Sequence, residues 1–128
     1  MQKTLAILAF TALVACVEDP VDGRQAFLED CSGCHGTDAK GTGSFGRQLI
    51  KEPPDLTRLA FRNGGVFDRV AVMSVIDGLN RGAHFSGAMP EFGDTNMGPL
   101  VMQEEGDHAV PIPHRLLVLT DYLESIQR

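Results

Sequence analysis

The stretch EDCSGCHGTD, Glu29 to Asp38, places Cys31 and Cys34 three positions apart, with His35 directly after the second cysteine. Three chemistries use two thiols and an imidazole at such close spacing: a redox dithiol, a zinc site and covalent attachment of haem. The rest of the sequence distinguishes among them, and the choice decides the fold.

A redox dithiol of the thioredoxin type occurs where a strand leads into a helix, inside a βαβ unit. Here Phe27, Cys31 and Cys34 are spaced by four and three residues, which predicts a helix over Arg24–His35 with the cysteines at its end. The flanking sequence has no alternating strand pattern. The context is therefore wrong for a redox dithiol.

A zinc site requires four ligands in tetrahedral geometry. Cys34 and His35 are adjacent, which makes it awkward for both to bind one ion. The remaining histidines do not form a second compact pair; they are His84, His108 and His114. The spacing fits no usual zinc pattern.

Covalent haem accounts for all three residues. Two thiols on one helical turn, Cys31 and Cys34, reach the two vinyl groups of one porphyrin, and His35 then points at the iron. Cys-x-x-Cys-His is the attachment sequence of c-type haem. The sequence therefore predicts one haem c, bound covalently through Cys31 and Cys34.

Apolar periodicity predicts two more helices, over about Val66–Leu79 and Pro113–Gln127. The segments between them are rich in glycine and proline, and no convincing strand is found. The predicted class is all-α, with helices separated by long irregular loops. The longest loop, Asp94–Ile112, is of a length that usually has a function. The predicted core is thin, so a haem would have to fill part of it.

The N-terminus differs in composition from the rest of the chain. Residues 1–15 have one basic residue, Lys3, followed by a short apolar run, which is typical of a secretory signal and too short for a stable membrane span. The run ends in LVAC, Leu13 to Cys16, which resembles the lipobox of bacterial lipoproteins. We therefore expect acylation at Cys16, a lipidated tether over residues 16–23 and one domain over residues 24–128. A plain secretory signal and a buried N-terminal helix are the alternatives.

These features imply export to the periplasmic side of a bacterial membrane, with the lipid anchor as the membrane contact. Val17, which follows the expected lipidation site, resembles the pattern that directs lipoproteins to the outer membrane. The net charge of −6 argues against nucleic acid as a partner.

Nearly all of residues 21–128 resembles a class I cytochrome c domain. Gly23 and Phe27 lie eight and four residues before Cys31, as the family's glycine and aromatic do. The family's Pro-x-Leu is matched by Pro54-Asp55-Leu56 and its Met-Pro by Met89-Pro90. The family's last helix carries an aromatic that crosses the first helix, and Tyr122 matches it. Two features differ: Pro53 stands where the family often has glycine, and the segment after Met89 is longer than in minimal members.

The resemblance implies a cytochrome c fold, with three main helices and long loops around one haem. It also implies that the Pro54 carbonyl accepts a hydrogen bond from His35, and that Met89 is the sixth iron ligand. Met97, Met102 and His84 are the rival ligands, whereas Met73 is expected in the core. We expect Phe45 and Leu56 to line the ring, and a subset of three arginines to pair with the propionates: Arg47, Arg58 and Arg62.

A haem iron with both axial positions filled has no site for substrate, so the expected function is one-electron transfer to redox partner proteins in the periplasm or membrane. Two alternatives stay open. In the first, the chain is a haem-bearing subunit of a larger respiratory oxidoreductase, with the loop Asp94–Ile112 as its interface. In the second, the sixth position of the iron is open, and the protein is a haem enzyme or gas sensor.

Overall fold

The computed structural model describes residues 22–79, 81–82, 87–95 and 97–128. The expected signal (1–15), Cys16, nearly all of the tether and the rival ligand His84 lie outside these ranges. Among the described helices, none is both long enough and apolar enough to cross a bilayer.

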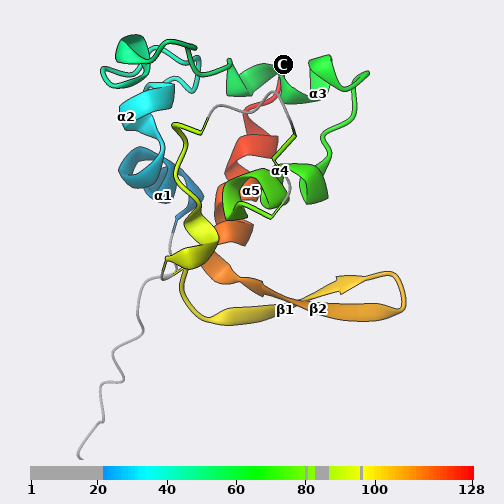
Figure 1. Cartoon of the computed structure of the whole chain (residues 1–128). Coiled ribbons are helices and arrows are strands. Elements are labelled where there is room, and N and C mark those ends of the chain that lie inside the picture. Colours follow the sequence, from blue (N-terminus) through cyan, green and yellow to red (C-terminus); the bar gives the residue numbers. More distant parts are fainter. Residues whose placement is uncertain (1–21, 80, 83–86, 96) are drawn as a thin grey trace, which may run out of the picture.

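The centre of the fold is a pair of crossing helices, α1 (Gly23–Asp30) and α5 (His114–Ser125), with α4 (Arg69–Asp77) packed on the other side of α5 (Figure 1). Five short helical segments lie on the connections. They are α2 (Ser32–His35), α3 (Leu59–Arg62) and the 3₁₀ turns η1 (Gly46–Gln48), η2 (Leu56–Arg58) and η3 (Phe92–Asp94). The all-α prediction is confirmed for the body of the molecule.

The bounds of two predicted helices were too wide. The helix expected over Arg24–His35 is interrupted at Cys31, where φ is −117°, far from the helical value, so that α1 and α2 are separate. The helix expected from Val66 begins only at Arg69, because the Asp68 side chain accepts a hydrogen bond from the Ala71 N–H and so acts as the N-cap.

The long segment after Met89 contains a β-hairpin, and the prediction that no strand occurs was wrong. Strands β1 (Leu100–Glu105) and β2 (His108–Pro113) pair antiparallel, and the hairpin projects from the helices (Figure 1). Gly106, at φ 63°, opens the two-residue turn, a conformation that glycine adopts without steric cost. Pro111 and Pro113 fit here because both strands of a two-stranded sheet are edges.

The core is small, as the sequence predicted. Phe27, Leu119 and Thr120 are its largest fully buried side chains, and the Thr120 hydroxyl donates to the Leu116 carbonyl at 2.8 Å. The buried apolar residues come from α1, α4, α5 and the segments beside them: Ala26, Phe27, Ala39, Ile76, Met97, Leu116, Leu119 and Leu123.

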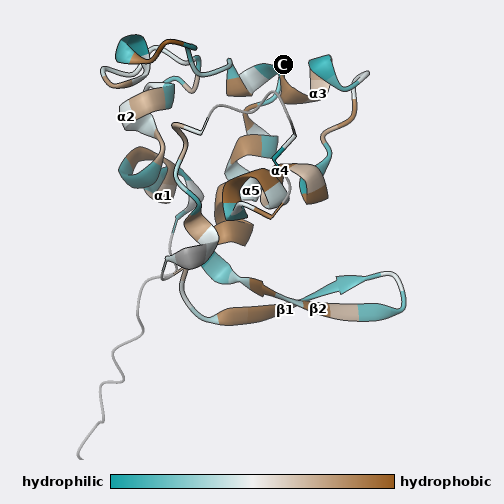
Figure 2. Ribbon diagram, viewed as in Figure 1, coloured by the Kyte–Doolittle hydropathy of each residue, from teal (hydrophilic) through white to brown (hydrophobic). Residues whose placement is uncertain are grey.

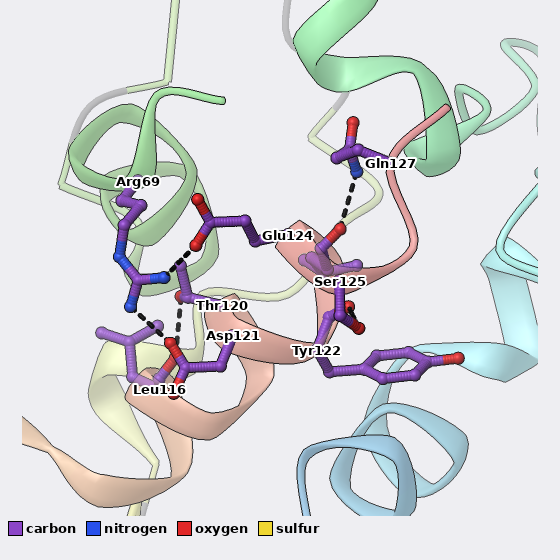
Figure 3. Close-up of polar contacts among 9 residues, drawn as sticks. Arg69, Leu116, Thr120, Asp121, Tyr122, Glu124, Ser125 and Gln127 are labelled. Atoms are coloured by element: carbon purple, nitrogen blue, oxygen red, sulfur yellow. Dashed lines mark hydrogen bonds and ion pairs between the residues drawn. The ribbon is translucent and has the colours of Figure 1, made fainter. Parts of the chain in front are cut away.

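Ion pairs join the helices at the edge of this core. Arg69 on α4 pairs with Asp121 and Glu124 of α5 (Figure 3). At the other end of α5, Arg115 pairs with Glu29 and Asp30 at the end of α1, both at 2.7 Å. Each arginine is bound by two carboxylates, which fixes α5 against both of its neighbours.

Candidate functional site

The two cysteines of the Cys-x-x-Cys-His sequence lie where α1 passes into α2. Cys31 caps α2 and Cys34 lies within it; both are free thiols and both are half-buried. Burial raises the pKa of Cys31 to about 12, with a further contribution from the Asp30 carboxylate. Two unpaired thiols one turn apart are the arrangement that attachment to one haem edge requires.

His35, the last residue of α2, is half-buried and carries an unsatisfied polar atom. Its Nδ1 is buried, and within the described part of the chain no group meets it with normal hydrogen-bond geometry. Burial lowers the pKa of His35, while the nearby Pro54 carbonyl raises it. The lowered pKa favours the neutral ring, the form that ligates a metal, and the Pro54 carbonyl lies beside it.

The loop after His35 folds back tightly on the attachment sequence. The Gly43 N–H donates to the Cys34 carbonyl at 3.1 Å and the Gly41 N–H to the His35 carbonyl at 2.8 Å. A Cβ at Gly41, where φ is +83°, would lie 2.1 Å from the Pro53 carbonyl oxygen. These glycines thus permit close contact between backbones, and Pro53, which departs from the family pattern, forms part of that contact.

The described methionines lie in four different environments. Met89 is half-buried, packs against the core and lines an open pocket of about 450 Å³. Met73 also packs against the core, as expected, from α4. Of the rival ligands, Met97 is itself a core residue, 5% exposed, and Met102 lies 64% exposed on β1. Met89 thus differs from Met97, which lies in the core, and from Met102, which lies at the surface.

Arg81 is the residue of this region that the sequence reasoning missed. Its guanidinium donates to the carbonyls of Met89, at 2.7 Å, and of Pro90. It also donates to the Val75 carbonyl in the last turn of α4, at 3.1 Å. An arginine just beyond a helix end is a known partner for the last carbonyls, and that was the available signal.

The three arginines that were proposed for haem propionates have protein contacts of their own. Arg47 donates to the Thr42 carbonyl at 2.5 Å and Arg62 to the Asp55 carbonyl at 2.8 Å. Arg58 lies over the Phe61 ring, 4.3 Å from its centroid. Phe45, expected to line a haem, is 64% exposed, and Leu56 packs against the core.

Helices α1 and α5 cross with their aromatic side chains in contact, as the family resemblance implied. The rings of Phe27 and Tyr122 lie 5.3 Å apart between centroids, inclined at 44°, and Tyr122 points toward α1 in Figure 3. A Cβ at Gly23 would lie 2.1 Å from the Val118 carbonyl oxygen, so only glycine lets the two backbones approach this closely.

The segment around the Pro-x-Leu sequence is connected to the residues that follow α5. The amide of Gln127 donates to the Leu56 carbonyl at 2.8 Å and accepts from the Ala60 N–H at 2.9 Å. The last helix therefore supports both ends of the site: α1 before the cysteines, and the segment after Pro54.

A comparison with protein-family models matches residues 20–102 to the cytochrome c family. The matched range includes Cys31, Cys34, His35, Pro54 and Met89. Searches among curated proteins and among solved structures gave no significant match.

The family match spans most of the chain, and the chain's own residues fit the group that the family binds. The fit consists of two free thiols on one turn, a neutral imidazole with its buried Nδ1 beside the Pro54 carbonyl, and a helix crossing that only glycine permits. The chain belongs to the cytochrome c family, whose members carry covalently bound haem c and transfer electrons.

Proposed function

We propose that this cytochrome c is a membrane-anchored one-electron carrier with a single haem, bound through thioethers to Cys31 and Cys34 and ligated by His35 and Met89. The observation that carries the proposal is the free thiol pair directly before a neutral His35 whose Nδ1 lies buried beside the Pro54 carbonyl. No disulfide or ion pair of the described residues competes for these groups.

The proposed ligands determine what the site does. Bound haem supplies a reversible one-electron change at its iron. His35 and Met89 would both ligate the iron, which would leave it no position for a substrate. A thioether ligand favours the reduced state, and burial among apolar side chains disfavours added positive charge, so both raise the reduction potential. The Pro54 carbonyl would orient His35 and keep its Nδ1 proton in place.

The anchor part of the proposal concerns Cys16. Acylation there would hold the domain at the periplasmic face of the membrane, and Val17 favours the outer membrane. A short tether raises the effective concentration of the carrier near membrane-bound redox partners. We expect Cys16→Ser to move the protein from the membrane fraction to the soluble fraction, with an unchanged visible spectrum. Retention of this variant in the membrane would refute the anchor.

The ligand set is tested by visible spectroscopy of the full-length holoprotein, oxidised and then reduced. We expect a low-spin spectrum with a weak long-wavelength sulfur-to-iron band in the oxidised form. Met89→Ala should abolish this band, whereas the exposed Met102→Ala should keep it. A high-spin spectrum that shifts on adding cyanide or carbon monoxide would overturn the carrier function in favour of catalysis or gas sensing.

A second candidate, a fixed subunit of a larger oxidoreductase, is favoured by the hairpin. Leu100 and Met102 lie two residues apart, hence on one face of β1, and are 65% and 64% exposed. The strand is apolar at its start and hydrophilic toward the turn (Figure 2), where Glu104, Glu105 and Asp107 follow. Such a surface fits a protein partner that offers an apolar groove beside basic side chains.

The two functions predict different native sizes. As a subunit, the wild-type protein in mild detergent would migrate as a large assembly, and Met102→Asp would release it. As a shuttle, wild type and variant would migrate alike at the size of the single chain.

A further inference from the structure

Arg81 connects the end of α4 to the segment that carries Met89. Its three nitrogens donate to three carbonyls: Nε to Val75, Nη1 to Met89 and Nη2 to Pro90. The first carbonyl belongs to the last turn of α4, and the other two belong to the segment that carries Met89. The guanidinium therefore fastens the main chain on both sides of the Met89–Pro90 peptide bond to the end of a helix.

The position of Arg81 makes these bonds strong. Its side chain is only 12% exposed, so water competes little for its donors, and Glu91 lies 3.9 Å from Nη1. A charged donor gives shorter and stronger hydrogen bonds than a neutral one. The planar guanidinium donates in several fixed directions at once, which the single ammonium of a lysine cannot reproduce.

The rest of the segment is held against the same helix end. A Cβ at Gly78, where α4 ends with φ +105°, would lie 2.8 Å from Cγ of Glu91. A Cβ at Gly93 would lie 2.5 Å from a carboxylate oxygen of Asp77. The segment is thus attached to α4 by Arg81 at Met89 and Pro90, and by close packing at Glu91 and Gly93.

We propose that Arg81 is the positioning residue for the sixth ligand: by fixing the carbonyls of Met89 and Pro90 to α4, it keeps the Met89 sulfur at the iron against competing ligands. This inference rests on the proposed function, because it requires that Met89 ligates. Arg81 does not itself touch the iron. Its effect is to restrict the backbone at Met89 and Pro90, so that less conformational freedom is lost when the sulfur binds.

The test measures how easily imidazole replaces Met89 in the oxidised full-length holoprotein, followed by loss of the sulfur-to-iron band. For Arg81→Gln we expect imidazole to bind at least about tenfold more tightly, which is about 1.4 kcal/mol. Arg81→Lys keeps the charge without the planar array of donors, and should lie between Arg81→Gln and wild type. It also serves as the measurable variant if Arg81→Gln fails to bind haem.

Arg69→Gln is the matched control. Arg69 also links α4 to a neighbouring segment by two side-chain contacts, but that segment is α5 and not the Met89 loop. The Arg69→Gln substitution should lower the free energy of unfolding while leaving the imidazole affinity within about twofold of wild type. If Arg69→Gln shifts imidazole affinity as much as Arg81→Gln, the effect is one of general stability and the positioning role is refuted.

The outcomes separate this inference from the proposed function. If the wild type lacks the sulfur-to-iron band, or Met89→Ala keeps it, Met89 is not the ligand and both proposals fall. If Met89→Ala abolishes the band but Arg81→Gln and Arg81→Lys bind imidazole like wild type, only the role of Arg81 is refuted.

Discussion

Gly23 on α1 lies directly against the Val118 carbonyl on α5, with no room for a Cβ between the two backbones. Gly23→Ala should therefore force α1 and α5 apart and disturb the contact of Phe27 with Tyr122. Overpacking of this kind costs about 1–3 kcal/mol. Urea unfolding of the holoprotein measures this loss of unfolding free energy. Gly82→Ala, where a Cβ would meet nothing within 4 Å, is the control and should have little effect. Equal stability of the two variants would contradict the close crossing.

The ion pairs of Arg115 give the stability a dependence on pH. Hydrogen bonds from Arg115, and then from Gln25, lower the pKa of Glu29 in the folded protein. A carboxylate with a lowered pKa stabilises the fold above its unfolded pKa, and this contribution is lost as the pH falls through the folded pKa. Wild type should therefore be more stable than Glu29→Gln at pH 7, and the difference should shrink as the pH falls below 4.5 and through the lower folded pKa.

The control for this prediction is Glu104→Gln, in the exposed hairpin. It should show no such difference at either pH. If the difference in stability between wild type and Glu29→Gln persists unchanged in acid, Glu29 acts through packing and not through its charge.

The two rival methionines should differ sharply in their effect on stability. Met97 is 5% exposed in the core, and its carbonyl accepts from the Arg115 N–H at 3.0 Å. Truncation of a buried methionine to alanine costs about 2–5 kcal/mol, whereas Met102→Ala, at the surface, should change stability by less than about 0.5 kcal/mol. Neither should remove the sulfur-to-iron band. Loss of the band in a folded Met97→Ala would reassign the ligand.

The outer half of the hairpin should be dispensable for the haem domain. Replacement of residues 103–110 by Asn-Gly retains the pairing of Met102 with Pro111 and supplies a favoured two-residue turn. We expect an unchanged spectrum and an unfolding free energy within about 0.5 kcal/mol of wild type, because the removed residues are exposed. A large loss of stability would show that the hairpin is a structural part of the domain.

Much of this fold follows from local patterns, and the deviations have identifiable causes. The helix crossing was implied by the family resemblance, which Gly23, Phe27 and Tyr122 carry at matching positions. These residues act by their size, which is visible in the sequence. The hairpin was not predicted because Pro111 and Pro113 argue against an internal strand, whereas both strands of this two-stranded ribbon are edges that tolerate proline.

The candidate site likewise contains residues that the sequence could identify and residues that it could not. The proposed attachment residues lie within five positions of one another, so the sequence alone could single out Cys31, Cys34 and His35 as candidates. The role of Arg81 depends on which carbonyls lie around it after folding, and eight residues separate it from Met89. No local pattern encodes that proximity. Met89 itself stays a prediction, which its position supports.

The pairing of α1 with α5 also has a consequence in time. Asp30 and Arg115 are 85 residues apart, so in the exported chain that we propose the thiols reach the periplasmic side before the helix that covers α1. In that interval Cys31 is a solvated thiol of ordinary reactivity, whereas in the folded chain burial raises its pKa to about 12. Docking of the last helix thus ends the period in which the chain presents the Cys31 sulfur readily to a modifying enzyme.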